Sequence, residues 1–186
     1  MVQEVLEIYR EHICNMVKIG TSYPKHEVNY EQTIVTPGAT MITQYMLASG
    51  SRDFLKDAKA QIDILSRFNG NQPDYHLYET AIRHWDDFWF GKSRIYGDTF
   101  PHYWSLLTGL AYLNYYKLTG EKEYLEKATD NIRNCLCLFY PDGGASCAYV
   151  YPYSLNGEHG EFYDEWANDQ DFALYYYLKY FSTKEG

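Results

Sequence analysis

The sequence predicts an all-α fold made of consecutive αα-hairpins. Apolar side chains recur along most of its 186 residues at intervals of three and four, the spacing that lines one face of a helix. The stretches with this spacing end at glycine or at Asn-Gly, which are common helix stop signals. The length suits one domain, so we expect a single hairpin-repeat domain over residues 1–186.

The first predicted hairpin spans about residues 1–49 and contains two helices. The second of them is expected over 36–49, with Pro37 at the first helical position, which proline favours. The first helix runs from Val2 to Lys18 and places its apolar face at Val5, Ile8, Tyr9, His12, Ile13 and Met16.

The second and third hairpins, at about 51–118 and 121–183, each pair two helices of different character. One is amphipathic and is expected to face solvent on one side, at 52–68 and again at 122–138. Its partner is apolar on most faces and is expected to be buried, at 101–118 and again at about 164–181.

A weak internal repeat joins the second and third hairpins. The stretch "GSRDFLKDAKAQIDIL", from Gly50, aligns with "GEKEYLEKATDNIRNC", from Gly120, at an offset of seventy residues. The identical pairs are Gly50/Gly120, Leu55/Leu125, Ala58/Ala128 and Ile62/Ile132, and Phe54 aligns with Tyr124. Repetition of this kind is typical of architectures built by stacking one structural unit.

Short and long connections alternate along the chain. The joins at Gly50 and Gly120 are very short, whereas those at about 19–35, 69–100 and 139–163 are long and rich in Tyr, Trp, His, Asp and Glu. Loops beyond about fifteen residues in a compact domain are usually functional or disordered, and these are too aromatic for disorder. We therefore expect the functional site in the long connections.

The stretch "GDTFPHYWSLLTGLAYLNYYKLTGEKEYLEKATDNI", residues 97–132, reads as an inner helix, a short turn and an outer helix. In this order the chain resembles the (α/α) toroid, or six-hairpin glycosidase-like, superfamily. The resemblance is architectural, covers nearly the whole chain and includes no specific family's active-site motif. It implies that the long loops and the starts of the inner helices line one end of the toroid, where carbohydrate binds.

The sequence departs from that superfamily in size, because a full toroid has six hairpins and about three are predicted here. The apolar inner helix from Leu106 to Leu118 needs covering, so we expect self-association or a missing N-terminal half. In the second case the chain is the C-terminal half of a longer toroid. The sequence carries no signal peptide, which slightly favours the cytoplasm.

The composition limits the kinds of partner and ligand that the chain is expected to bind. The net charge of −9 is spread without a basic cluster, which argues against nucleic acid and against an anionic membrane surface. The cysteines show no metal-ligand spacing, and no phosphate cradle or dinucleotide motif is present, so no metal and no cofactor are predicted. Eighteen per cent of the residues are aromatic, and tyrosine favours half-buried, partly wet surfaces. An oligo- or polysaccharide is the expected ligand.

Hydrolysis of a glycosidic bond is the leading hypothesis for the chemistry. It needs two carboxylates flanking the bond, and a carboxyl group among aromatic side chains has a raised pKa suited to a general acid. The residues nominated for catalysis are Asp86, Asp87, Asp98, Glu161, Asp164 and His102. Ordinary structural roles compete, since Asp98 and Asp164 also fit helix caps and Asp86 and Asp87 also fit ion pairs with Arg and Lys.

Aromatic side chains in or beside the long connections are the candidates for substrate binding. The apolar face of a pyranose packs on a ring, while histidine and tyrosine bond its hydroxyl groups. The nominated residues are His84, Trp85, Trp89, Tyr103, Trp104, Tyr151 and Trp166. The segment "HWDDFWF", residues 84–90, is singled out because no capping or turn rule requires it.

Two alternatives remain open from the sequence. On the same scaffold a polysaccharide lyase would use histidine and tyrosine as base and acid, with Arg or Asn holding a uronate carboxylate; Arg83, His84 and Tyr96 fit this loosely. A non-catalytic helical-repeat module for binding or assembly would instead pair its loop carboxylates with Arg and Lys.

Overall fold

The computed structural model describes most of the predicted helices and short parts of the long connections. Helices dominate the described residues, which confirms the predicted all-α class, and two short antiparallel β pairs occur within the connections. The described residues are 2–19, 32–66, 69–72, 77–81, 104–139, 141–144, 154–155, 158–159, 175, 178–179 and 181–182.

The elements follow the predicted order of helices. The helices are α1 (Val2–Ile19), α2 (Gln32–Ser49), α3 (Leu55–Leu65), α5 (Trp104–Thr119), α6 (Lys122–Asn134) and the 3-10 turn η3 (Cys135–Leu138). The strands are β1 (Asn69–Gln72), β2 (Leu77–Ala81), β3 (Ser154–Leu155) and β4 (Glu158–His159). In the predicted last helix, residues 175, 178–179 and 181–182 are helical.

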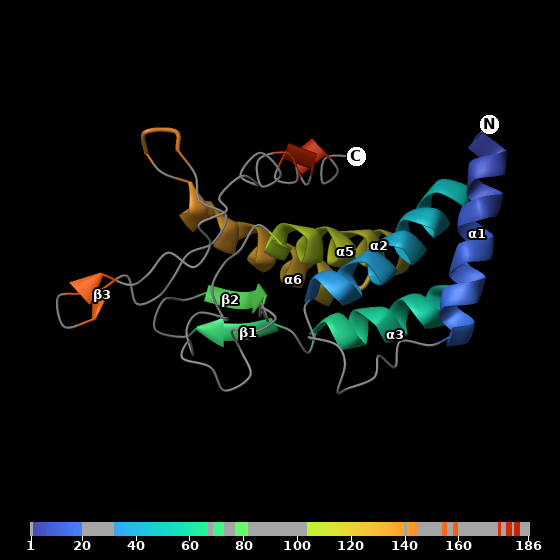
Figure 1. The fold of residues 1–186 in the computed structure, drawn as a ribbon, viewed down its shortest axis with the longest axis horizontal. Coiled ribbons are helices and arrows are strands. Elements are labelled where there is room, and N and C mark those ends of the chain that lie inside the picture. The colour runs from blue at the N-terminus through green and yellow to red at the C-terminus, as the bar shows by residue number, and fades with distance from the viewer. Residues whose placement is uncertain are drawn as a thin grey trace.

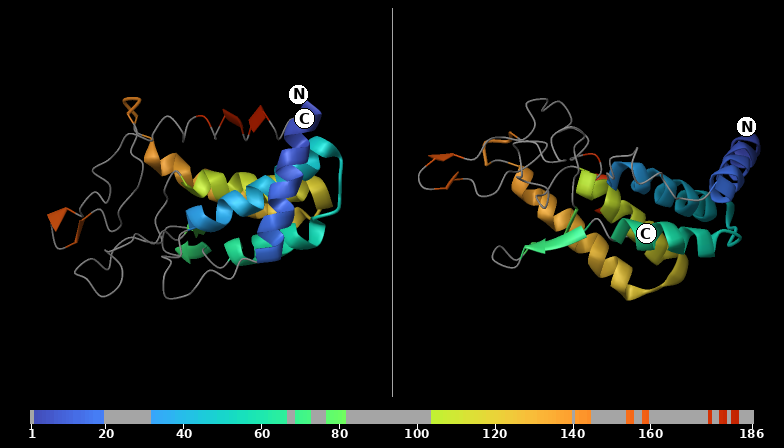
Figure 2. Two further views of the ribbon diagram at one scale, coloured as in Figure 1. Left: turned by 45° about the vertical axis from the view of Figure 1, so that its right-hand side comes forward. Right: turned by 60° about the horizontal axis from the view of Figure 1, so that its bottom comes forward.

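The helices form an inner and an outer layer. α2 packs beside α5, while α3 covers α2 and α6 covers α5, so that α5 lies between α2 and α6 (Figure 2, right). α1 stands across the other helices at one end, and the β1–β2 ribbon lies toward the opposite end (Figure 1). This arrangement agrees with an arc of hairpins from an (α/α) toroid.

The core runs along α5, as the sequence predicts for its most apolar helix. Seven of its side chains are buried hydrophobic residues: Leu106, Leu110, Ala111, Tyr112, Leu113, Tyr115 and Leu118. The outer helix α6 buries Tyr124, Ala128, Asn131 and Ile132 against it and turns its charged residues outward. The predicted buried character of α5 and the predicted amphipathic, partly solvent-facing character of α6 are therefore confirmed.

Both short joins are left-handed glycine turns. Gly50 has φ 74° and Gly120 has φ 78°, a conformation that residues with a Cβ rarely adopt. Each glycine N–H donates to the carbonyl four residues earlier, Met46 at 2.9 Å and Tyr116 at 2.7 Å. The hydrogen bond closes each inner helix at the point where the chain turns back toward its outer partner.

The predicted seventy-residue repeat extends to the contacts around these turns. Tyr45 and Phe54 meet edge to face with ring centroids 5.9 Å apart, and the residues seventy positions later, Tyr115 and Tyr124, do the same at 4.7 Å. The hydroxyls of Ser49 and Thr119 likewise accept the N–H groups of Ser51 and Glu121, each at 3.2 Å. We call this repeated unit of glycine turn and aromatic pair the hairpin corner.

The predicted start of α2 is wrong by a few residues. α2 begins at Gln32 and continues through Pro37, which therefore lies inside the helix and not at its first position. Proline has no N–H, so the helix forgoes one hydrogen bond there. The structure describes α5 from Trp104 onward, and its predicted start at Pro101 lies outside the described residues.

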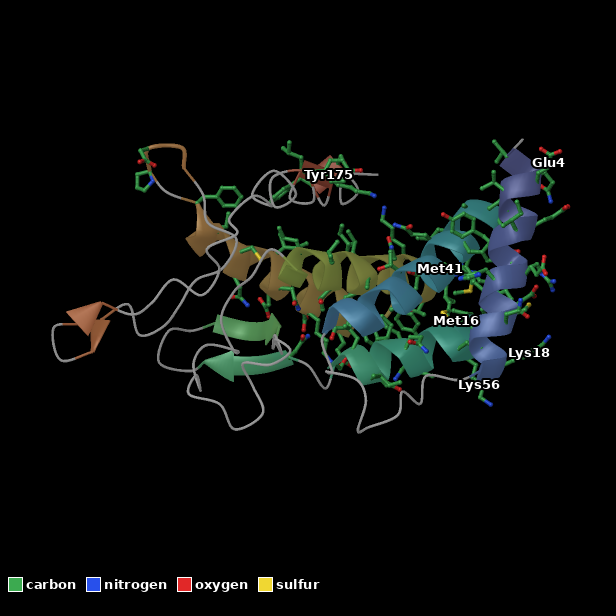
Figure 3. The ribbon with its side chains drawn as sticks, viewed as in Figure 1. Glu4, Met16, Lys18, Met41, Lys56 and Tyr175 are labelled. Atoms are coloured by element: carbon green, nitrogen blue, oxygen red, sulfur yellow. The ribbon has the colours of Figure 1, made fainter. Side chains whose placement is uncertain are left out.

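The apolar face predicted for α1 is only partly buried. Ile13 is fully buried and Met16 packs on the core near Met41 (Figure 3), whereas Val5, Ile8 and Tyr9 are exposed. The apolar arc of α1 is wider than the strip that α2 covers. No helix among the described residues is long and apolar enough to cross a membrane.

The close packing of α5 on α6 requires a residue without a side chain at position 109. A methyl group on Gly109 would lie 2.8 Å from Cγ1 of Ile132 and 3.1 Å from the carbonyl oxygen of Ala128. A methyl group on Gly38, in α2, would meet mainly the flexible end of Gln61, at 3.1 Å. The side chain next to Gly38 can therefore move aside for an added methyl group more readily than the atoms next to Gly109 can.

We predict that Gly109→Ala lowers the free energy of unfolding by about 1–3 kcal/mol, because the added methyl group overpacks the α5–α6 interface. Gly38→Ala is the matched control, and its cost is offset by the gain of about 1 kcal/mol in helix propensity. Urea denaturation of the two variants measures the difference. A Gly109→Ala protein as stable as the Gly38→Ala protein would contradict the packing described above.

Candidate functional site

A buried tyrosine hydroxyl anchors the start of the longest connection. Tyr112, on α5, is fully buried, and its hydroxyl lies 3.1 Å from the hydroxyl of Ser66 at the end of α3. It also accepts a hydrogen bond of 2.8 Å from Nδ2 of Asn69, the first residue of β1. Both sides of the α3–β1 junction are thereby tied to the centre of α5.

The ribbon that follows brings the chain back toward α6. β1 and β2 are antiparallel, with Asn69 opposite Ala81 and Gly70 opposite Thr80, and β2 packs on α6 and α5. The register shifts between Gly70 and Gln72, as at a β-bulge. The segment 82–103, which holds most of the candidate site residues, therefore begins at a ribbon packed on α6 and ends at the start of α5.

A second, smaller ribbon lies in the third long connection. Ser154 pairs with His159 and Leu155 with Glu158. The residues between the strands are Asn156 and Gly157, a sequence favoured in two-residue hairpin turns. That dipeptide is a sequence signal for this hairpin, and the helical periodicity used for prediction does not detect it. The ribbon lies in the chain between the candidates Tyr151 and Glu161.

The candidate residues themselves lie almost entirely outside the described residues. Trp104 is described as the first residue of α5, without its side chain. Outside the described residues lie Asp86, Asp87, Asp98, Glu161, Asp164, His102, His84, Trp85, Trp89, Tyr103, Tyr151 and Trp166. Their assignment therefore stays a prediction, and the structure contributes the elements that bound the segments carrying them.

Tyr115 and Lys59, near the second hairpin corner, both have raised pKa values. Burial, and secondly the charge of Glu121, raise the pKa of Tyr115 to about 12. The exposed ammonium of Lys59 has a raised pKa chiefly because it donates a hydrogen bond to Asp63. Tyr115 therefore keeps its proton at neutral pH, and its position beside Tyr124 gives it a packing role.

Lys127 is held over this aromatic cluster. Its Nζ lies 5.7 Å from the ring centroid of Tyr124 and 6.0 Å from that of Tyr112, and 2.9 Å from Oε1 of Glu123. These contacts place a cation against the outer side of the core, where it stabilises the packing of α6 on α5.

A cavity of about 360 Å³ lies at the opposite end of the fold from β1 and β2, between α1, the end of α2 and the first hairpin corner. Glu7, Arg10, Tyr45, Ser49 and Asp53 are among the residues that line it. It includes none of the candidate residues. Among the described residues, no group of three His, Cys, Asp or Glu side chains is arranged to hold a metal ion.

We predict that Tyr112→Phe increases amide hydrogen exchange in residues 69–81, because the ribbon loses its anchor on α5. Loss of the two hydrogen bonds to Ser66 and Asn69 is expected to cost about 1–3 kcal/mol of unfolding free energy. Tyr115→Phe is the control, since its hydroxyl makes no hydrogen bond within the described part of the chain. Equal exchange in the two variants would show that the hydroxyl of Tyr112 does not hold the ribbon.

Tyr115 also generates a pH-dependent prediction. Because its folded pKa of about 12 exceeds the usual 10.0, the folded state binds the proton more tightly than the unfolded state. This stabilisation is fully present below about pH 10 and is lost as the pH rises toward 12. Denaturation at a series of alkaline pH values should show a smaller loss of stability in Tyr115→Phe than in the wild type. Parallel losses would contradict the raised pKa.

Comparison with known proteins connects the chain to carbohydrate-active enzymes. A solved structure described as a polysaccharide lyase matches 95% of this chain with 51% sequence identity and a TM-score of 0.76. The chain spans about a quarter of that protein, since the match covers 26% of the solved chain. No protein-family model and no curated protein matches the sequence. Identity at this level over nearly the whole chain shows that the chain is similar in both sequence and fold to one part of that lyase.

Proposed function

We propose that this chain contributes to the cleavage of a polysaccharide by β-elimination, as a lyase or as part of one. The observation that carries the proposal is the 51% identity over 95% of the chain to a solved structure described as a polysaccharide lyase. The same observation favours elimination over the hydrolysis that the loop carboxylates first suggested. The chain spans 26% of that protein, so lyase activity in this chain is itself part of the proposal.

Elimination requires catalytic side chains different from those that hydrolysis requires. A base removes the proton from the carbon next to a uronate carboxylate, and the electron pair forms a carbon–carbon double bond. The bond between the next carbon and the glycosidic oxygen then breaks, and an acid protonates the leaving oxygen. A cation or amide beside the carboxylate makes the proton easier to remove.

Residues of the segment between β2 and α5 supply each of these groups. We assign the base to His84, the acid to Tyr96 and the carboxylate partner to Arg83, all from the segment 82–103. His102 is the second candidate base and lies two residues before the first residue of α5. The positive end of the α5 dipole at that position favours a negatively charged substrate group.

Trp85 and Trp89 complete the proposed site as platforms for sugar rings. They flank Asp86 and Asp87 in "HWDDFWF". In a lyase these two carboxylates bond sugar hydroxyls or pair with basic residues, and no longer need to act as acid and nucleophile. Under this proposal, substitution of a catalytic histidine lowers the rate of cleavage, whereas substitution of Asp86 or Asp87 has little effect on it.

The expected result is that the chain, supplied with uronate-containing polysaccharides, releases products with a conjugated double bond, detected by ultraviolet absorbance. We predict that His84→Ala or His102→Ala lowers the rate by roughly 10²-fold or more, the contribution typical of a general base. Asp86→Asn and Asp87→Asn should retain most of the activity. Trp85→Ala should weaken binding of the polysaccharide with the fold intact by circular dichroism.

The outcome distinguishes the candidate chemistries. Cleavage without a double bond, abolished by Asp86→Asn or Asp87→Asn, would establish hydrolysis in place of elimination. Binding without cleavage, lost in Trp85→Ala and retained in both histidine variants, would identify a binding module. Neither binding nor cleavage of any uronate polysaccharide would contradict the proposal for this chain.

A further inference from the structure

The cavity beside the first hairpin corner has a volume of about 360 Å³ and is bounded by three separate parts of the chain. α1 contributes Glu7 and Arg10, α2 contributes Tyr45, and the turn that follows α2 contributes Ser51 and Asp53. Because α1 stands across the ends of the other helices, its side chains meet those of the corner only in the folded chain (Figure 1). Pockets of about 300–1,000 Å³ are the size in which proteins bind small molecules.

Tyr45 lines this cavity and has a hydroxyl group without a protein partner. The residue is 8% exposed, and its ring packs edge to face on Phe54 with the centroids 5.9 Å apart. Within the described part of the chain, its hydroxyl makes no hydrogen bond. A buried tyrosine normally hydrogen-bonds its hydroxyl, so this group is left for a ligand or water in the cavity.

The charged groups of the cavity are also available to a ligand. The side chains of Glu7, Arg10 and Asp53 form no ion pair or hydrogen bond with any other described residue. The hydroxyl of Ser51 accepts the N–H of Asp53 at 3.1 Å, which leaves its own proton to donate. The cavity therefore offers two carboxylates as acceptors, together with a guanidinium and two hydroxyls as donors.

The second hairpin corner shows that the turn itself does not require these groups. In the seventy-residue repeat, Glu121 and Glu123 stand at the positions of Ser51 and Asp53. Oε1 of Glu123 lies 2.9 Å from Nζ of Lys127, whereas the first corner has an aspartate at the position of that lysine. The carboxylate of the second corner is thus paired, and the equivalent carboxylate of the first corner is not paired within the described residues.

This set of groups fits a ligand rich in hydroxyl groups. A hydroxyl both donates and accepts, so a site that binds several of them needs donors and acceptors together. Two carboxylates against one guanidinium give a net negative charge, which disfavours phosphates and other anions. Among the residues that the structure describes, no three His, Cys, Asp or Glu side chains are arranged to hold a metal ion. Leu6 and Ala48 are the aliphatic residues of the lining, which is too little apolar surface for a hydrophobic ligand.

We propose that this cavity binds a neutral sugar of one or two rings. The carboxylates of Glu7 and Asp53 accept hydrogen bonds from the sugar hydroxyls, while Arg10, Ser51 and the hydroxyl of Tyr45 donate to the sugar oxygens. The cavity contains none of the residues proposed for elimination, so it is a separate site. The inference does not depend on the proposed elimination, because the cavity binds a sugar whether or not the chain cleaves a polysaccharide.

Titration of the isotope-labelled chain with glucose, cellobiose, lactose and maltose, followed by amide NMR spectra, tests the proposal. With at least one of these sugars, the signals of residues 6–10 and 45–53 should shift and reach saturation. The signals of residues 119–124, at the second corner, should stay in place. Glucuronic acid, the anionic counterpart of glucose, should bind more weakly than glucose because the cavity has a net negative charge.

Substitutions at the two corners provide matched pairs. Glu7→Ala and Asp53→Ala should each raise the dissociation constant about tenfold, because each removes a charge-assisted hydrogen bond. Tyr45→Phe should raise it about threefold, since it removes one neutral hydrogen bond and keeps the ring. Glu123→Ala and Tyr115→Phe change the equivalent residues of the second corner and should bind as the wild type does.

Four results would overturn the proposal: no saturable shift with any of the four sugars, equal shifts at both corners, tighter binding of glucuronic acid than of glucose, or an equal loss of affinity in the control variants. Sugar binding that is lost in Trp85→Ala and retained in Asp53→Ala would also overturn it, because the sugar would then occupy the site proposed for elimination. Glu7→Gln and Asp53→Asn serve as second variants if an alanine variant loses its helical circular dichroism signal.

Discussion

The hairpin corner is the constraint on which the rest of the structure depends. Gly50 and Gly120 adopt φ of 74° and 78°, which strains any residue with a Cβ, and each reverses the chain immediately after an inner helix. The edge-to-face pair across each turn, Tyr115 with Tyr124 in the second, holds the outer helix at the angle that covers the inner one. Without these reversals the apolar surface of α5 would face water, at a cost of about 25 cal/mol for each Å².

The corners also determine where the long connections lie. Because each outer helix runs antiparallel to its inner partner, the short turns gather at one end and the long connections leave from the other. The end of α3 thereby reaches Tyr112, whose hydroxyl bonds Ser66 and Asn69 and ties the start of the 69–103 connection to α5. The proposed catalytic segment thus begins and ends on elements fixed by the core, as a site requires if its side chains are to be positioned for catalysis.

Periodicity predicted most of the helices and the repeat, because a helix face and a glycine stop are local properties of the chain. It misjudged α2, where the helix continues through Pro37, since tertiary packing can offset one absent hydrogen bond. It also missed the β1–β2 ribbon, because the segments of Asn, Gly and Gln that form β1 show no alternation. The sequence nominated the residues of the candidate site. The structure describes the helices and strands on either side of the segments that carry those residues.

The sequence by itself determined the all-α class, the two glycine turns and the buried character of α5, because each follows from spacing and conformational preference over a few residues. Tertiary structure decided which half of the apolar arc of α1 is covered, since Val5 and Ile13 look alike in the pattern and differ only in whether α2 reaches them. It likewise decided that a tyrosine within the apolar helix, Tyr112, anchors a distant loop. Contacts between residues more than forty positions apart depend on the folded arrangement of helices, which local spacing does not encode.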